Sequence, residues 1–413
     1  MRTWLVSGAA VFTAALAVTI PGALASPAAT PGVTSRSVTI GTTMPITGPA
    51  NFYASIGAGM RAYFSYINAR RAKSDGKRGV YGRQIILKVE DDGYNPVNTL
   101  QKTRKLVEQD KVFALVGGLG TEAQLAVRPY LNQQKVPQVY VSTGSTQFGA
   151  EHRQFPWSIG WQPDYLQEGI ALGKYVRGSL ANAKVAILYQ DDQYGRDLLG
   201  GYRKTANRTI TATEKYPVGA SGAAISSLVA RLRASGADTL LLISIPGPTI
   251  TALVTAYRIG WRPNLLVNSV GATEVWLTAA QNAAGSADAV NGVVTTTYLK
   301  DPASRKYAGD PQVKFYKRLM AKYLPGANAN NSQYYYGMAK AADFVQALYR
   351  AGKSPTRASL MRAVENLTYK SPWVITGAQI ITSPRNPFPM RYQKYARFNN
   401  GSYSEFGALQ KIR

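Results

Sequence analysis

Two stretches of the chain, residues 115–142 and 241–268, repeat the same order of elements: strand, turn, helix, proline and strand. Pro137 and Pro263 occupy equivalent places, so one offset of 126 residues (263 minus 137) aligns the two stretches. Parallel strands joined by helices place their turns along one edge of a sheet, where ligands of open α/β sheets bind. The repeat therefore predicts two similar lobes whose binding edges face one another across a cleft.

Strand and helix patterns alternate through the rest of the chain. Strands are expected at residues 37–45, 84–90, 184–189 and 292–298, with another ending at Tyr216 and a strand-like tail from Gly377. The expected helices cover residues 57–71, 96–109, 164–177, 194–209, 223–235, 311–323 and 332–350. This alternation predicts an α/β fold with doubly wound parallel sheets.

The N-terminus has the layout of a secretory signal. Arg2 precedes an apolar stretch, residues 9–20, and Ala23-Leu24-Ala25 supplies a small-x-small cleavage site, so residues 1–25 are predicted to be a signal peptide. The alternative, a membrane anchor, is disfavoured because a span needs about 20 apolar residues. Residues 26–36 are expected to form a flexible leader. The predicted location is therefore outside the cytoplasm, either periplasmic or extracellular and associated with the cell surface.

The composition narrows the range of partners. The chain has no cysteine, so it is not expected to be a lipoprotein and must be held together by its core without disulfides. Its 48 Lys and Arg residues against 22 Asp and Glu favour anionic surfaces. The basic residues are scattered and no nucleic-acid motif accompanies them, so no nucleic-acid partner is expected.

Groups that carry catalysis are scarce. His152 is the only histidine, and there is no Gly-x-Ser-x-Gly elbow, phosphate-binding loop or Gly-x-Gly-x-x-Gly turn. Asp91-Asp92 and Asp191-Asp192 each end a strand and open a turn, which favours capping over a metal site. The sequence predicts no enzymatic activity, no cofactor and no metal.

Hydroxyls and free backbone amides are concentrated at two adjacent strand ends. Gly120-Thr121 begins a helix, whose unpaired N–H groups favour an anion. Residues 143–146 follow the next strand and add three hydroxyls around Gly144, where a ligand can approach the backbone. Ordinary caps and turns are the alternative, but two turns that converge at one sheet edge favour a binding site.

Several motifs, in order and spacing, resemble those of the substrate-binding proteins of ABC transporters in the branched-chain amino acid-binding family. They are Pro45-Ile46-Thr47-Gly48-Pro49, Asp91-Asp92, Val116-Gly117, Val136-Pro137 and Asp191-Asp192-Gln193-Tyr194-Gly195. The resemblance implies the type I periplasmic binding fold, with three crossovers near Gly160, Tyr298 and Gly377. Lobe 1 would comprise residues 37–160 and 298–376. Lobe 2 would comprise residues 161–297 and 377–413, the last of which also form the hinge return.

The resemblance also implies a set of ligand-binding residues. In lobe 1 they are Tyr53, Thr121, Gly144 and Thr146, and in lobe 2 the equivalent tyrosine is Tyr194. A further tyrosine position of the family falls on Pro246.

The family's acidic residue, which holds the ligand's ammonium group, falls on Val270. Either the register slips and an acid such as Glu274, in the following helix, reaches the site, or the ligand is a carboxylate without an ammonium group. The second is favoured, because the uninterrupted repeat pairs Val270 with Gly144.

These inferences predict a monomeric exported receptor that captures a small carboxylate-bearing ligand, an amino acid or related organic acid, between two lobes. It would deliver this ligand to the permease subunits of an ABC transporter. The alternative is a sensor module of the same fold that signals to a membrane partner.

Overall fold

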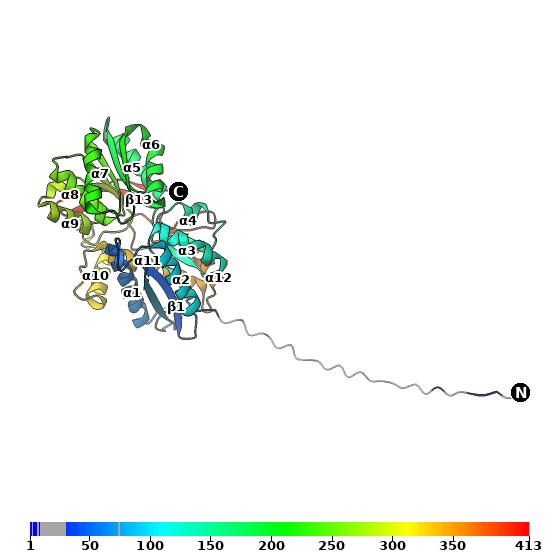
Figure 1. The fold of residues 1–413 in the computed structure, drawn as a ribbon. Helices are drawn as coiled ribbons and strands as arrows, with labels where there is room; N and C mark the ends of the chain where they lie inside the picture. Colours follow the sequence, from blue (N-terminus) through cyan, green and yellow to red (C-terminus); the bar gives the residue numbers. More distant parts are fainter. Residues whose placement is uncertain (2, 6–7, 9–29, 73–74, 413) are drawn as a thin grey trace.

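The structure is a computed structural model that describes residues 1, 3–5, 8, 30–72 and 75–412 (Figure 1). Most of the predicted signal peptide, with its cleavage site, lies outside the described residues. Within the predicted leader, the carbonyl of Gly32 accepts a hydrogen bond from the N–H of Thr39 at 2.7 Å, and Val33 bridges to Val38. The described end of the leader therefore hydrogen-bonds to the first strand.

One lobe is built on a five-stranded parallel sheet with the order β2-β1-β3-β4-β5. Its strands are β1 (Ser37–Met44), β2 (Gln84–Asp91), β3 (Leu115–Val116), β4 (Gln138–Val141) and β5 (Ser158–Gly160). The helices of this lobe are α1 (Ala54–Ala69), α2 (Pro96–Arg104), α3 (Thr121–Gln133), α4 (Gln147–Ala150), α10 (Pro311–Tyr323), α11 (Ser332–Ala351) and α12 (Arg357–Glu365). Figure 1 shows these helices gathered in the lower lobe, where α1 packs along α11.

The other lobe is built on a seven-stranded sheet with the order β14-β13-β10-β9-β8-β6-β7. The parallel strands are β6 (Val185–Gln190), β7 (Ile210–Tyr216), β8 (Thr239–Ile243), β9 (Asn264–Val267) and β10 (Val294–Thr297). An antiparallel hairpin extends the edge with β13 (Tyr392–Asn399) and β14 (Ser402–Lys411). The helices are α5 (Tyr165–Ser179), α6 (Gln193–Ala206), α7 (Gly222–Ala234), α8 (Pro246–Arg258) and α9 (Glu274–Ala284).

The predicted α/β class and the internal repeat are confirmed. The unit β3-α3-β4 in one lobe corresponds to β8-α8-β9 in the other. Every residue of β4 and of β8 is buried, as expected for parallel strands covered by helices on both faces. Pro246 begins α8, where its missing N–H has no helical partner to lose.

The chain passes between the two sheets more than once. It leaves the five-stranded sheet after β5, returns to that lobe after β10 to form α10, α11 and α12, and rejoins the seven-stranded sheet at β13. Both lobes are therefore made from segments that are distant in sequence.

The C-terminal segment differs from the strand-like tail expected from Gly377. A short strand, β12 (Ile380–Ile381), pairs with β11 (Thr368–Tyr369) in a separate two-stranded sheet. Pro384, Pro387 and Pro389 follow it, and a residue without an N–H cannot donate to a sheet ladder. Regular pairing with the large sheet therefore begins only at β13. In the part of the chain that the structure describes, none of the helices has the length and apolar character required to cross a membrane.

Candidate functional site

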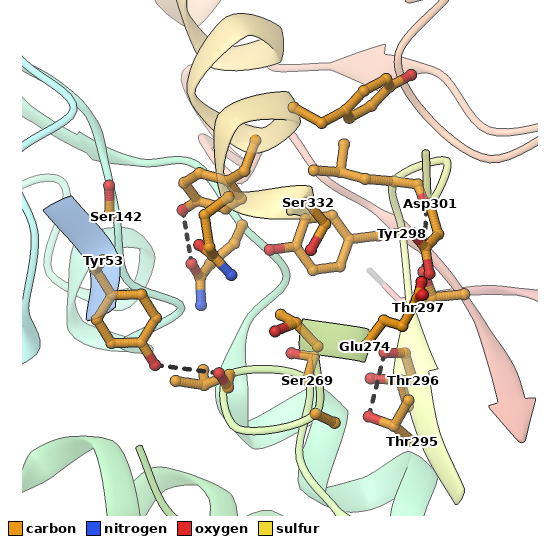
Figure 2. A pocket seen from close by; sticks show the side chains of 18 of the residues that line it. Tyr53, Ser142, Ser269, Glu274, Thr295, Thr296, Thr297, Tyr298, Asp301 and Ser332 are labelled. Atoms are coloured by element: carbon orange, nitrogen blue, oxygen red, sulfur yellow. Dashed lines mark hydrogen bonds between the residues drawn. The ribbon is translucent and has the colours of Figure 1, made fainter. Parts of the chain in front are cut away.

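A cavity lies between the two lobes, and both contribute to its wall (Figure 2). Its empty volume is about 1170 Å³, part of which is open to solvent. This volume is large enough for a small organic ligand. Tyrosines contribute much of the wall, and each offers an apolar ring with a hydroxyl at its tip. The tyrosines are Tyr53, Tyr94, Tyr165, Tyr194, Tyr298, Tyr307, Tyr335, Tyr336 and Tyr403.

The beginning of α3 forms one part of this wall, as the sequence predicts. Gly120 is the N-cap with φ of 101°, and a Cβ there would lie 2.8 Å from the ring of Tyr94, so both the conformation and the space require glycine. No side chain caps this end of the helix. The Thr121 hydroxyl shares a hydrogen bond with that of Thr143 at 2.7 Å. The first turn of α3 thus presents backbone donors and a hydroxyl to the cavity.

Gly144 and Thr146, predicted for the same edge, are not among the lining residues. A Cβ on Gly144 would lie 2.1 Å from the carbonyl oxygen of Pro163, so this glycine permits close packing of the backbone. The Thr146 hydroxyl donates to Asp164 Oδ1 at 2.5 Å, and its N–H donates to Asp197 Oδ2 at 3.0 Å. Gly144 packs against the start of α5, and Thr146 contacts both α5 and α6. Their role in ligand binding stays a prediction.

Ser142 is the residue after β4 that does line the cavity. Its hydroxyl donates to the carbonyl of Gly117 at 2.8 Å and accepts from Nζ of the buried Lys340. The sequence favoured residues 143–146, which follow it, because nothing in the local pattern distinguishes this serine.

The remaining predicted residues, Tyr53, Tyr194 and Val270, all line the cavity. The Tyr53 hydroxyl donates to the carbonyl of Val270 at 3.1 Å and so connects the two lobes (Figure 2). The Tyr194 hydroxyl donates to Asn268 Oδ1 at 2.8 Å. Burial raises the pKa of Tyr53 and of Tyr194 well above the usual value, so both hydroxyls remain protonated donors.

Two acidic residues, Glu274 and Asp301, also line the wall. The sequence named Glu274 only under the less favoured alternative and did not indicate Asp301. Glu274 is the first residue of α9, and Asp301 follows β10. Burial, together with the charge of Asp301, raises the pKa of Glu274 to about 8, and burial raises the pKa of Asp301 to about 6. Val270 and Glu274 both line the cavity, so an acid is present in the wall without a slip of the register.

The paired carboxylates act as turn and cap acceptors. Asp91 accepts hydrogen bonds from the N–H groups of Ile46 and Thr47 at 3.0 and 3.2 Å, and Asp192 caps α6 by accepting from Gly195 at 3.0 Å. His152 is buried, with its ring nitrogens near the Ser158 carbonyl and the Glu365 carboxylate. Within the described ranges, no cluster of three or more His, Cys, Asp or Glu side chains is arranged to hold a metal ion.

Contacts outside the cavity also join the lobes. Glu122 Oε1, on α3, accepts a hydrogen bond from the N–H of Gln193 at the start of α6 at 2.7 Å, and Arg196 lies 3.5 Å from the same oxygen. Phe52 meets Trp276 of the other lobe edge to face, with ring centroids 5.1 Å apart. These contacts, with the Tyr53 hydrogen bond, hold the lobes together around the cavity.

Residues 37–392 match the sequence profile of the family described as periplasmic binding protein. The chain therefore belongs to this family, whose members bind ligands and are not enzymes. The match agrees with the resemblance inferred from the motifs.

Among curated relatives, the chain is 26% identical over 259 residues to Leu/Ile/Val-binding protein homolog 7 of Brucella abortus. That match covers 59% of this chain and 61% of the relative. The chain is also 26% identical over 163 residues to an amino acid binding protein of Pseudomonas aeruginosa, a match that covers 39% of this chain and 43% of that protein.

Two solved structures share the fold. A branched-chain amino acid ABC transporter protein from Thermus thermophilus, with bound valine, has a TM-score of 0.78 at 20% identity, covering 91% of this chain and 97% of that one. A fatty acid ABC transporter substrate-binding protein from Thermomonospora curvata has a TM-score of 0.77 at 20% identity, covering 93% and 94%.

Proposed function

We propose that the protein is an exported receptor that captures a small carboxylate-bearing ligand, an amino acid or related organic acid, between its lobes and delivers it to an ABC permease. The observation that carries this proposal is the composition of the cavity wall. Thr121 at the uncapped start of α3 lies on one lobe, and Tyr194 and Val270 lie on the other.

The first turn of α3 suits a carboxylate. Its N–H groups lack helical partners, and the positive end of the helix dipole favours a negative charge. The Thr121 hydroxyl adds a donor or acceptor at the same place. A carboxylate bound there would accept charge-assisted hydrogen bonds, which are stronger than neutral ones.

Binding between lobes couples capture to a change of shape. A ligand that contacts both walls stabilises the closed form relative to the open one by the contacts that only closure provides. The closed form would be the one presented to the permease. The names of the two structural relatives support a carboxylate ligand, because branched-chain amino acids and fatty acids both carry that group.

The proposal is tested by small-angle X-ray scattering on the protein with and without its ligand, identified by mass spectrometry of the compound that copurifies. We expect a smaller radius of gyration at saturating ligand. An unchanged radius would indicate a site on one lobe only and would contradict capture by closure.

A further inference from the structure

The cavity has two chemically different sides. In Figure 2, Tyr53 and Ser142 lie on one side, and Glu274 and Asp301 lie on the opposite side. We call the part of the wall formed by Glu274 and Asp301 the acidic end.

The carboxylates of the acidic end have no cationic partners in the described ranges. A third acid in the wall, Glu405, is paired with Lys306 at 2.5 Å. The one cationic side chain in the wall, Lys300, is paired with Asp310 at 2.7 Å. Among the described residues, no cationic side chain forms an ion pair with Glu274 or Asp301, and the one cation that acts on both from a distance is the exposed Lys317 of α10.

A buried oxygen at this end lacks a partner. Glu274 Oε2 is buried without a hydrogen bond. Gln333, a polar residue that is only 7% exposed, also lines the cavity. Buried polar groups are normally paired, because leaving them unpaired costs stability. The unpaired carboxyl oxygen beside the cavity therefore indicates a missing partner that donates a hydrogen bond.

We infer that the acidic end is a subsite for a cationic group of the ligand, an ammonium or amidinium, carried at a distance from the carboxylate that binds at α3. This inference rests on the proposed function and specifies its ligand class as an amphoteric compound such as an ω-amino acid. A cation at the acidic end would favour the ionised carboxylates of Glu274 and Asp301, and its N–H groups can donate charge-assisted hydrogen bonds to both.

The titration of Glu274 provides an independent readout. Its pKa of about 8 leaves the carboxyl mostly protonated at neutral pH, and a bound cation lowers that pKa by favouring the carboxylate. Cation binding near neutral pH therefore releases a proton. The other charged group that acts on both acids is Lys317 of α10, which is exposed and lowers both pKa values, while Tyr403 of β14 stays neutral because burial raises its pKa.

The test uses matched pairs that differ only in the terminal ammonium: 6-aminohexanoate with hexanoate, 5-aminopentanoate with pentanoate, and 4-aminobutanoate with butanoate. Each is titrated calorimetrically into the wild type, Glu274→Gln, Asp301→Asn and the control Glu108→Gln, in two buffers of different ionisation enthalpy. Glu108 is an exposed acid that contacts Arg104 and Tyr130 of its own lobe.

We expect at least one ammonium compound to bind the wild type tenfold or more tightly than its partner, with release of a proton. That advantage should disappear in Glu274→Gln, weaken in Asp301→Asn and persist in the control. The melting temperature of each ligand-free variant shows whether it is folded. If only one of the two carboxamide variants, Glu274→Gln or Asp301→Asn, folds, that variant alone is compared with the wild type.

The inference is overturned if no ammonium compound surpasses its uncharged partner in the wild type, including the case in which none of the six binds, or if the advantage survives in both carboxamide variants. Neither result touches the receptor function, which is judged separately by closure on the copurifying compound.

Discussion

Glu122 offers a way to weaken closure without touching the cavity, because it is not among the lining residues. Its carboxylate accepts the hydrogen bond from Gln193 N–H at 2.7 Å and lies 3.5 Å from Arg196, with the Glu122 side chain 43% exposed. A hydrogen bond to a charged group contributes ~1.5–3 kcal/mol when buried, and an exposed ion pair contributes ~0.2–1 kcal/mol. With the exposure taken into account, we expect Glu122→Ala to destabilise the closed form by ~1–2 kcal/mol.

If the open form predominates without ligand, this change weakens ligand affinity by ~5–30-fold. Calorimetry with the copurifying compound measures the affinity, and scattering measures the radius of the ligand-free protein. Glu122→Gln should have a smaller effect that depends less on salt, because it keeps an acceptor but loses the charge. Glu108→Ala, which removes an acid that contacts only its own lobe, is the control. Unchanged affinity in Glu122→Ala would show that this contact does not contribute to closure.

Three further variants test the cavity itself. Thr121→Val should weaken binding of the copurifying ligand by about tenfold or more, since a hydrogen bond to a charged group contributes ~1.5–3 kcal/mol. Thr121→Ser keeps the hydroxyl and should bind nearly normally. Equal affinities of the two variants in calorimetry would show that the Thr121 hydroxyl does not bind the ligand. Tyr53→Phe deletes the hydrogen bond to Val270 and should cost ~2–10-fold in affinity, with a larger radius in the ligand-free protein if the contact matters for closure. Burial raises the pKa of Glu274 to about 8, above the value of 4.5 that it has in the unfolded chain. The stability linked to its protonation is therefore fully present below pH 4.5 and is lost as the pH rises through about 8. Glu274→Gln should therefore stabilise the ligand-free protein at about pH 8 relative to about pH 5, by ~1 kcal/mol after discounting for partial exposure; denaturation curves that shift equally at both values would contradict this.

The sequence predicted features whose causes are local or periodic. The repeat around Pro137 and Pro263 identified both βαβ units, and the helix start at Thr121 indicated a wall of the cavity. Gly144 shows the limit of such reasoning. It follows a strand end as expected, but the chain turns there toward α5, and the glycine serves backbone packing beside Pro163.

Asp301 could not be predicted, and Glu274 entered only as the less favoured alternative, because the positions of both depend on tertiary structure. The sequence placed Glu274 in the helix after Val270, yet which side chain of the first turn faces the cavity depends on how α9 packs against its neighbours. Asp301 lies where the chain leaves β10 for the other lobe, in a segment without periodic pattern. Neither position carries a local signal of burial.

The repeated passage of the chain between the sheets also determines the order in which the molecule can fold. α1 packs along α11, and β10 pairs with β13, so each lobe needs residues that are synthesised long after its first strands. Contacts between distant segments slow folding, because the entropy of closing a long loop is lost before those contacts form. Neither lobe can be completed as an independent N-terminal unit, and an emerging chain stays incompletely packed until its last hundred residues are available.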